Sequence, residues 1–263
     1  MGPSDRLFRR DQAGLHTAPW NVKHARVEVE PGVRLHVAEV GDGPLVVLLH
    51  GFPNDWRLWQ PLMPRLAQAG LRVVAVDLRG SGESDEPRGV EAYEISRLVR
   101  DVDQLIAGLG EHRASVVGHD WGGGLAWVFA MRYPQRLDKL VIMNAPHPRV
   151  FARALRTPRQ LLRSWYILLF QLPWLPEVLT RARTGALNYY RAMWREPVVI
   201  VRIDQPVLVV WGERDPFLGR ELAQPDADDV PHLTVRRFAR AGHWVMRDEQ
   251  RGVADAVVAF LHA

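Results

Sequence analysis

Five short runs of apolar residues, rich in valine and spread along the chain, constrain the fold more than any other feature of the sequence. They occupy residues 44–51, 71–77, 114–120, 139–145 and 206–212. Continuous apolar runs of this length are typical of strands covered on both faces, which occur in parallel sheets. Helical patterns lie between and after them, at residues 56–69, 92–109, 122–132 and 248–261. Strands that alternate with helices predict an α/β fold with helices on both faces of the sheet.

Three further strands complete the predicted sheet. Residues 25–30 and 33–40 flank Pro31-Gly32, a pair typical of a hairpin turn, and residues 233–238 form a last short run. The hairpin adds an antiparallel edge. We therefore expect a mostly parallel sheet of eight strands.

The regular alternation stops between residues 147 and 203. This segment holds five prolines, many aromatic residues and many arginines, and no strong strand pattern occurs before the strand-like run Val198–Ile203. It predicts a small helical cap that is inserted between two strands, over their carboxyl ends. The expected domains are then a core of residues 1–146 and 204–263 and a cap of residues 147–203.

The composition excludes several classes of protein. The chain has 263 residues, of which 47% are hydrophobic and 24% charged, the balance of a globular protein. It has no cysteine, so disulfides, thiolate metal sites and cysteine nucleophiles are excluded. The His, Asp and Glu residues lack the spacing of metal ligands, so we expect neither a metal nor a cofactor.

Charge and hydropathy bear on the partners and the location of the protein. The net charge is +4, and the arginines are scattered among acidic residues, which argues against nucleic-acid binding. The densest cluster, from Arg149 to Arg163, is expected on one face of a helix. Residues 1–14 lack the apolar core of a signal peptide, and no apolar run reaches the ~18 residues that a membrane span needs. We therefore expect a cytoplasmic protein without a membrane span.

The stretch Gly118-His119-Asp120-Trp121-Gly122 follows one of the apolar runs and opens a helical pattern. This is the arrangement of a nucleophile elbow, a strained turn between a strand and a helix that needs glycines close by. The residue at the nucleophile position is an aspartate. Asp120 can also be the N-cap of the following helix, which is a common place for aspartate.

Two later loops supply the partners that such a nucleophile needs. Asp215 follows the run 206–212, and His243 follows the last predicted strand. The order nucleophile, acid and histidine is the order of the α/β-hydrolase fold. We expect Asp215 to be the acid, and Glu213 is the alternative.

A fourth loop follows the run 44–51. It contains Phe52, whose backbone N–H is predicted to form an oxyanion hole together with the N–H of Trp121. Four other polar residues lie near the strand ends. We interpret Ser81 and Ser84 as structural, and His50 and His119 as structural or pocket-lining.

An aspartate nucleophile indicates the kind of bond that is attacked. A carboxylate that displaces a group at a saturated carbon forms an ester, which a histidine-activated water can hydrolyse with the help of an oxyanion hole. The reactions that fit are epoxide opening and carbon–halogen cleavage. An epoxide oxygen needs a proton donor, and the predicted cap holds three of the chain's five tyrosines. The alternative interpretation of these tyrosines is packing inside a small cap.

The sequence resembles a known family, the epoxide hydrolases of the α/β-hydrolase fold. The segments that carry the resemblance are "VRLHVAEVGDGPLVVLLHGFP", "GHDWGGGLAW", "NAPHP", "SWYILLFQLP", "WGERDPFLG" and "AGHW". The resemblance implies that Asp120 is the nucleophile, His243 the base and Asp215 its partner. It also implies that Tyr166 and Tyr190 hold and protonate the epoxide oxygen, with Tyr189 as the alternative to Tyr190.

The expected partners are an apolar epoxide and water, bound by a monomer or a homodimer. Residues expected to contact the substrate are Pro53, Trp56, His119, Tyr189 and Trp244. Compared with the family, several helical turns are missing from the cap, because only residues 178–185 separate its two tyrosine-containing segments. We expect a pocket that is more open on one side and admits bulky epoxides.

Two other functions fit parts of the same pattern. A haloalkane or haloacid dehalogenase uses the same Asp and His chemistry, but a second halide donor such as Asn is expected where Phe52 stands. A non-catalytic receptor on this fold keeps the pocket and tends to lose a member of the triad, and none is lost here. A serine-type esterase fits the pattern least well, because no serine occupies the elbow.

Overall fold

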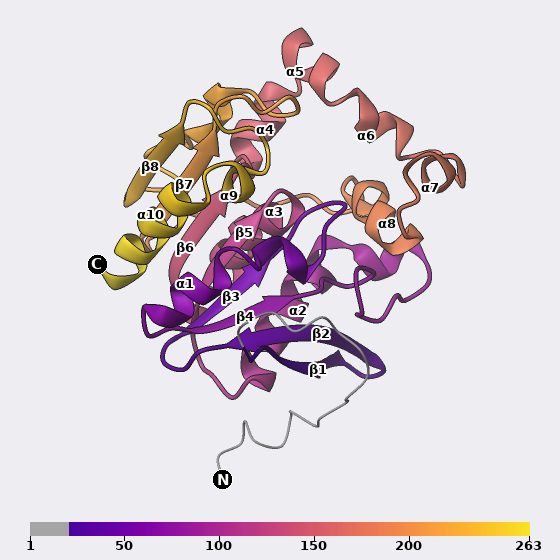
Figure 1. Ribbon diagram of the computed structural model, residues 1–263. Helices are drawn as coiled ribbons and strands as arrows, with labels where there is room; N and C mark the ends of the chain where they lie inside the picture. Colours follow the sequence, from indigo (N-terminus) through magenta and orange to yellow (C-terminus); the bar gives the residue numbers. More distant parts are fainter. Residues whose placement is uncertain (1–20) are drawn as a thin grey trace.

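An eight-stranded sheet forms the centre of the computed structural model, which describes residues 21–263 (Figure 1). The stretch 1–14, on which the absence of a signal peptide was predicted, lies outside the described residues. The strands are β1 (Lys23–Glu30), β2 (Val33–Val40), β3 (Leu45–Leu49), β4 (Arg72–Val76), β5 (Ala114–His119), β6 (Leu137–Met143), β7 (Val207–Gly212) and β8 (Leu233–Phe238). All eight predicted strands are therefore present.

The sheet is mostly parallel, as predicted. Its order is β1-β2-β4-β3-β5-β6-β7-β8, and only β2 runs antiparallel to its neighbours β1 and β4. The turn between β1 and β2 contains Gly32 at φ 80°, a left-handed conformation that glycine adopts without strain. Because β3 and β5 to β8 are parallel, their carboxyl ends meet at one edge of the sheet, where the loops with candidate functional residues begin.

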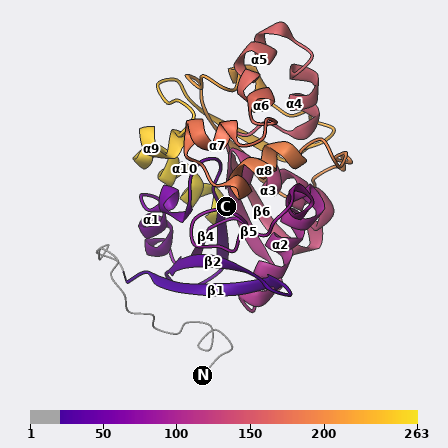
Figure 2. The same ribbon diagram turned by 90° about the vertical axis from the view of Figure 1, so that its right-hand side faces the viewer.

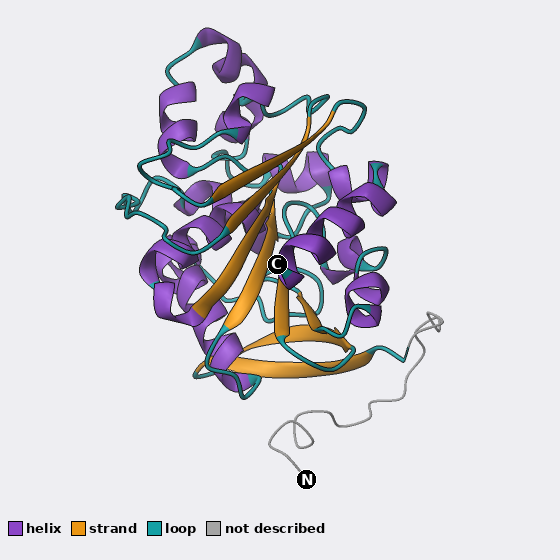
Figure 3. Cartoon of the chain, turned by 90° about the vertical axis from the view of Figure 1, so that its left-hand side faces the viewer, coloured by secondary structure: helices purple, strands orange, loops and turns teal. Residues whose placement is uncertain are grey.

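Helices cover both faces of the sheet (Figure 3). The helices of this core are α1 (Met63–Gln68), α2 (Ile95–Gly108), α3 (Trp121–Arg132), α9 (Val245–Asp248) and α10 (Gln250–His262), with short 3₁₀ helices η2 (Trp56–Trp59), η3 (Val90–Tyr93), η4 (Pro134–Arg136) and η5 (Arg220–Ala223). Alternate residues of β3 pack on opposite faces of the sheet: Val47 packs in the cluster with α2 and α3, and Val46 in the cluster with α1 and α10. The continuous apolar runs of the sequence follow from this double coverage.

Two predicted elements differ from the structure. The predicted helix 56–69 is divided into η2 and α1, because Pro61 lacks the N–H that a continuous helix requires there. The strand-like run Val198–Ile203 forms no strand. Since β6 pairs directly with β7, the sheet has no position left for another strand between them.

The segment between β6 and β7 is helical and lies over the carboxyl ends of the strands (Figures 1 and 2). Its helices are α4 (Pro148–Ala154), α5 (Pro158–Arg163), α6 (Trp165–Leu169), α7 (Leu175–Thr180) and α8 (Thr184–Ala192). Only three residues, 181–183, connect α7 to α8. Within residues 21–263, no helix combines the length and the apolar character that crossing a membrane requires.

Candidate active site

Asp120 lies in the turn between β5 and α3, at φ 52° and ψ −119°, a conformation that costs energy for any residue but glycine. The turn is possible because its neighbours lack side chains: a Cβ on Gly51 would collide with the Asp120 side chain, and one on Gly122 with the carbonyl oxygen of Leu49. The Asp120 side chain makes no capping hydrogen bond to α3. Its Oδ1 instead accepts a hydrogen bond from the Phe52 N–H at 2.8 Å. Asp120 thus occupies the N-cap position of α3, but its side chain does not cap the helix.

His243 connects the two carboxylates that the sequence singled out. It lies in the loop between β8 and α9, and its Nδ1 is 2.7 Å from Asp215 Oδ2. Its Nε2 faces Asp120 Oδ2 at 3.5 Å. Both His243 and Asp215 are buried. The three residues, far apart in the sequence, thus form a continuous chain of charged groups.

Both carboxylate oxygens of Asp215 accept two hydrogen bonds each. Its Oδ1 accepts from the N–H groups of Phe217 and Leu218, and its Oδ2 accepts from Asn144 as well as from His243. The alternative acid, Glu213, lies beside Arg237 at 3.7 Å instead. The geometry therefore pairs His243 with Asp215.

Asn144 is a site residue that the sequence reasoning missed. It follows β6 at φ 41°, and its side chain bonds both to Asp215 and to the backbone N–H and carbonyl of Gly212. The signal was present in "NAPHP", since asparagine is among the residues that tolerate a positive φ at the end of a strand. Asn144 fixes the Asp215 carboxylate relative to β7.

Burial and neighbouring charges determine the protonation of Asp120 and His243. Burial alone would raise the pKa of Asp120, but the hydrogen bond and the positive charge of His243 outweigh it, with smaller help from the Trp121 N–H, and the pKa is lowered. Burial alone would lower the pKa of His243, but the hydrogen bonds to Asp120 and Asp215 outweigh it and raise the pKa to about 10. At neutral pH the site therefore holds an imidazolium between two carboxylates.

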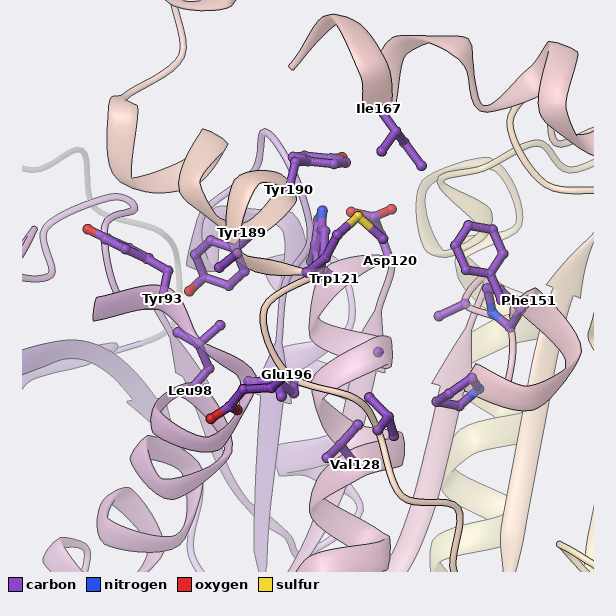
Figure 4. Close-up of a pocket in the computed structure, with 18 of the residues that line it drawn as sticks. Tyr93, Leu98, Asp120, Trp121, Val128, Phe151, Ile167, Tyr189, Tyr190 and Glu196 are labelled. Atoms are coloured by element: carbon purple, nitrogen blue, oxygen red, sulfur yellow. The ribbon is translucent and has the colours of Figure 1, made fainter. Parts of the chain in front are cut away.

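Two tyrosines of the helical segment face the same cavity as Asp120. Tyr166 comes from α6 and Tyr190 from α8, and their rings meet edge to face with centroids 6.0 Å apart. Tyr190 also packs against the rings of Trp121 and Phe52, and it lies over Asp120 in Figure 4. Burial, and then the charge of Asp120, raise the pKa of both hydroxyls. Both tyrosines are therefore protonated at neutral pH.

Tyr189 is the neighbour that the sequence could not separate from Tyr190. Its hydroxyl donates a hydrogen bond to the carbonyl oxygen of Arg79 at 2.9 Å. In Figure 4 this hydroxyl points away from Asp120, toward the side of the cavity where Tyr93 lies. Tyr189 lines the cavity with its ring, but its hydroxyl is already engaged.

The cavity between sheet and helices has a volume of about 190 Å³. Apart from Asp120 and the tyrosines, most of its lining is apolar, for example Leu98, Val128, Phe151, Ile167 and Leu218. Glu196 also lines it, but both of its carboxylate oxygens bond to Ser96 at the start of α2. The cavity fits an apolar molecule with one polar group directed at Asp120.

Four of the five residues expected to contact the substrate do not line this cavity. Trp56 is buried in the apolar cluster that includes α1. Trp244 follows His243 in the sequence, and its indole N–H donates a hydrogen bond to the side chain of Asn54. Pro53 is exposed and outside the lining. Of the five, only Tyr189 lines it.

His119 also lies outside the lining, behind His243. It is fully buried, and its Nε2 donates to the backbone carbonyl of His243 at 2.9 Å. Burial, and then the charge of His243, lower the pKa of His119 to about 3, so it is neutral. His50 is likewise structural, because its Nε2 accepts the N–H of Leu78. His119 supports the loop that carries His243.

Comparisons with known proteins show the family to which this chain belongs. Residues 44–182 match the model of the α/β hydrolase fold family. The chain is 35% identical over 279 residues to epoxide hydrolase 3 of Xenopus tropicalis. This alignment covers 88% of this chain and 76% of that protein. The alignment is longer than this whole chain, so the relative contains segments that this chain lacks.

Solved structures give the same result. A Bacillus megaterium epoxide hydrolase in complex with an inhibitor superimposes with a TM-score of 0.84 at 30% identity, over 91% of this chain and all of that one. A variant of an epoxide hydrolase from Bacillus megaterium, complexed with its product (R)-3-[1]naphthyloxy-propane-1,2-diol, superimposes with a TM-score of 0.81 at 30% identity, over 90% of this chain and all of that one. The chain belongs to the epoxide hydrolases of the α/β hydrolase fold.

Proposed function

We propose that this protein hydrolyses an apolar epoxide to a vicinal diol in two steps, through an ester on Asp120. One observation carries the proposal: the two oxygens of this carboxylate have different surroundings. Oδ1 accepts the Phe52 N–H, whereas Oδ2 faces His243 at 3.5 Å. Oδ2 is thus the oxygen directed at the histidine, and Asp120 shares its cavity with Tyr166 and Tyr190.

In the first step Oδ2 of Asp120 attacks one carbon of the epoxide. A bond forms between Oδ2 and this carbon, the bond from the carbon to the ring oxygen breaks, and the ring oxygen takes a proton from Tyr166 or Tyr190. The product is a hydroxyalkyl ester. The lowered pKa of Asp120 supports this step, because it keeps the nucleophile ionised at neutral pH.

The ester also changes His243. Its pKa is raised to about 10 by two carboxylates, and alkylation removes the charge of Asp120. The pKa then falls, and the imidazolium can return its proton to the tyrosinate left by the first step. His243 becomes a neutral base only after the ester has formed, still oriented by Asp215 through Nδ1.

In the second step Nε2 of His243 takes a proton from water, and the hydroxide attacks the ester carbonyl carbon. The negative charge that develops on Oδ1 is stabilised by the N–H groups of Phe52 and Trp121. When the bond to the diol oxygen breaks, that oxygen takes the proton from His243. The carboxylic acid left on Asp120 gives its proton back to His243, which restores the starting state.

Substrate selection is proposed to lie in the helical segment. Residues 147–203 act as a cap in this proposal, because α6 and α8 supply the two tyrosines. The apolar lining supports epoxides with an apolar substituent. The naphthyloxy diol is the product of the Bacillus megaterium relative, and the short connection between α7 and α8 supports similarly bulky substrates here.

Trapping the ester tests the proposal. In His243→Gln the first step proceeds and the second does not, so a peptide with Asp120 gains the full mass of the epoxide, as measured by mass spectrometry after digestion. The matched control is His232→Gln, at an exposed histidine, which should turn over without accumulating ester. An Asp120 peptide that stays unmodified with every aryl and alkyl epoxide tried contradicts the mechanism. A gain of the alkyl group alone, with halide release from a haloalkane, would identify a dehalogenase.

A further inference from the structure

The outer side of helices α5, α6 and α7 is apolar and exposed. Each residue of this set is between 45% and 76% exposed, and we call the set the outer apolar face: Leu161, Leu162, Trp165, Leu168, Leu172, Trp174, Val178 and Leu179. Figures 1 and 2 show these helices along the outside of the cap, away from the sheet. Exposed apolar side chains that gather in this way mark an interaction surface.

Helix α6 and the turn after it show most clearly that this face lacks a partner. One side carries Ile167 and Phe170, which are buried in the cluster around Tyr190. The other side carries Trp165 and Leu168, which are 62% and 71% exposed. A helix that is apolar all round is normally buried on all sides. In this helix one side faces the catalytic cavity and the other has nothing to cover it among the described residues.

Unpaired positive charges surround the outer apolar face. Among residues 21–263, no acidic group forms an ion pair with Arg156, Arg159, Arg163 or Arg181. The one acidic residue between Arg156 and Arg181 is Glu177, which bonds to Arg191 instead. Over residues 147–203 the sequence has ten arginines and two acidic residues, although the net charge of the whole chain is only +4. The positive charge of the protein is thus concentrated on the cap.

We propose that the outer apolar face docks this protein on an anionic lipid surface. Tryptophan and leucine side chains enter the boundary between head groups and acyl chains, and arginines beside them meet the anionic head groups. The other occupant, a second copy of this chain, fits the charges less well. In a symmetric dimer the same patch meets itself, so the unpaired arginines of one copy would face those of the other.

Docking would place the active site close to the membrane. Helix α6 carries Trp165 and Leu168 toward the lipid and Tyr166 and Ile167 toward the catalytic cavity. An apolar substrate dissolved in the lipid would then have a short path to Asp120. This inference goes beyond the proposed function, and lipid binding can be measured without any epoxide, so either can fail while the other holds.

Sedimentation with lipid vesicles tests the proposal on the full chain. The vesicles are phosphatidylcholine alone or phosphatidylcholine mixed with phosphatidylglycerol. We expect the wild type to sediment with the mixed vesicles and far less with phosphatidylcholine alone, and to lose binding as salt is added. The charge variant Arg156→Gln/Arg159→Gln/Arg163→Gln should bind about 100-fold more weakly. The apolar variant Trp165→Ser/Leu168→Ser should bind at least about tenfold more weakly.

Two matched controls separate this surface from general charge and hydrophobicity. Arg236→Gln/Arg240→Gln/Arg251→Gln removes the same charge from exposed positions of the core. Val199→Ser/Val201→Ser removes exposed apolar residues outside the outer apolar face. Both should bind within about twofold of the wild type. All variants should keep the wild-type melting curve, because the changed side chains are exposed or, for Arg163, partly exposed.

Three results would overturn the proposal. The first is a wild type that does not sediment with the mixed vesicles, or that binds equally to phosphatidylcholine alone. The second is an equal loss of binding in the controls. The third is a wild-type dimer in analytical ultracentrifugation that Trp165→Ser/Leu168→Ser converts to monomer, because a second copy would then cover the face.

Discussion

The two walls of the catalytic cavity are built by different interactions. On the sheet side, three of the four carboxylate oxygens are fixed by hydrogen bonds: the two oxygens of Asp215 accept four, and Asp120 Oδ1 accepts the Phe52 N–H. On the cap side, Tyr166 and Tyr190 are positioned by ring packing. Neither of these two hydroxyls donates a hydrogen bond to any described residue, in contrast to that of Tyr189.

This difference between hydrogen bonding and ring packing suits the two walls to different parts of the proposed reaction. Covalent attack and ester hydrolysis need atoms held within a fraction of an ångström, which a hydrogen-bonded network on rigid strands provides. Proton donation has to follow an epoxide oxygen whose position varies with the substrate. A hydroxyl that donates to no acceptor among the described residues can do so, because the substrate oxygen becomes its first acceptor.

The largest effect is expected for the nucleophile. Asp120→Asn keeps the shape of the side chain and removes its charge, so kcat/KM for any epoxide should fall by at least about 10⁴-fold. The measurement is diol formation, with Asp138→Asn, an exposed carboxylate of the core, as the control. Activity within tenfold of the wild type would show that the sheet wall does not supply the attacking group.

The next effect separates two neighbouring carboxylates on the same wall. Asp215→Asn removes the charge that orients His243, and kcat should fall by about 10³- to 10⁴-fold. Glu213→Gln changes the residue paired with Arg237 and should leave kcat within about threefold. Since ester formation does not need a base, Asp215→Asn should still accumulate the ester on Asp120. Equal losses in the two variants would contradict the assignment of Asp215.

Single substitutions of the cap tyrosines should cause smaller losses. Tyr166→Phe and Tyr190→Phe should each lower kcat/KM by roughly 10²-fold, because one hydroxyl can partly replace the other, and the double variant should lose more. Tyr189→Phe is the matched control. It removes the hydrogen bond to Arg79, which should cost about 1 kcal/mol of stability with little effect on turnover. A larger loss of activity in Tyr189→Phe than in Tyr190→Phe would reverse the assignment.

The smallest effect concerns stability and pH. The pKa of His243 is raised to about 10 from its ordinary 6.5. Its contribution to stability is therefore fully present below pH 6.5 and lost as the pH rises through about 10, by a few kcal/mol in the free energy of unfolding. Urea unfolding across this range measures it. In Asp120→Asn one of the two carboxylate charges is gone, so the loss should be smaller and complete at a lower pH. An unchanged profile in that variant would contradict the coupling.

Sequence patterns predicted the sheet wall well and the cap wall poorly, for a physical reason. Strands such as β5 and β7 are continuous apolar runs, and their carboxyl ends must meet at one edge, so Asp120, Asp215 and His243 could be brought together from their order alone. Asn144 was missed because its role depends on a hydrogen bond across two strands. Such a contact leaves no periodic pattern.

The errors share a different cause. Trp56 and His119 stand close in sequence to site residues, but each side chain points into the core rather than the cavity. Proximity along the chain does not fix the direction of a side chain in a loop. The choice between Tyr189 and Tyr190 likewise depends on how α8 is rotated, and packing against η3 and α6 decides this.

The most direct test of the account is a single turnover in water labelled with ¹⁸O, with the enzyme in excess over the epoxide. If Asp120 is the nucleophile, the oxygen added to the substrate comes from its carboxylate, and the water oxygen enters Asp120 when the ester is hydrolysed. We predict an unlabelled diol and a labelled Asp120 peptide. A labelled diol with an unlabelled Asp120 would mean that water attacks the epoxide directly, and would contradict the central claim.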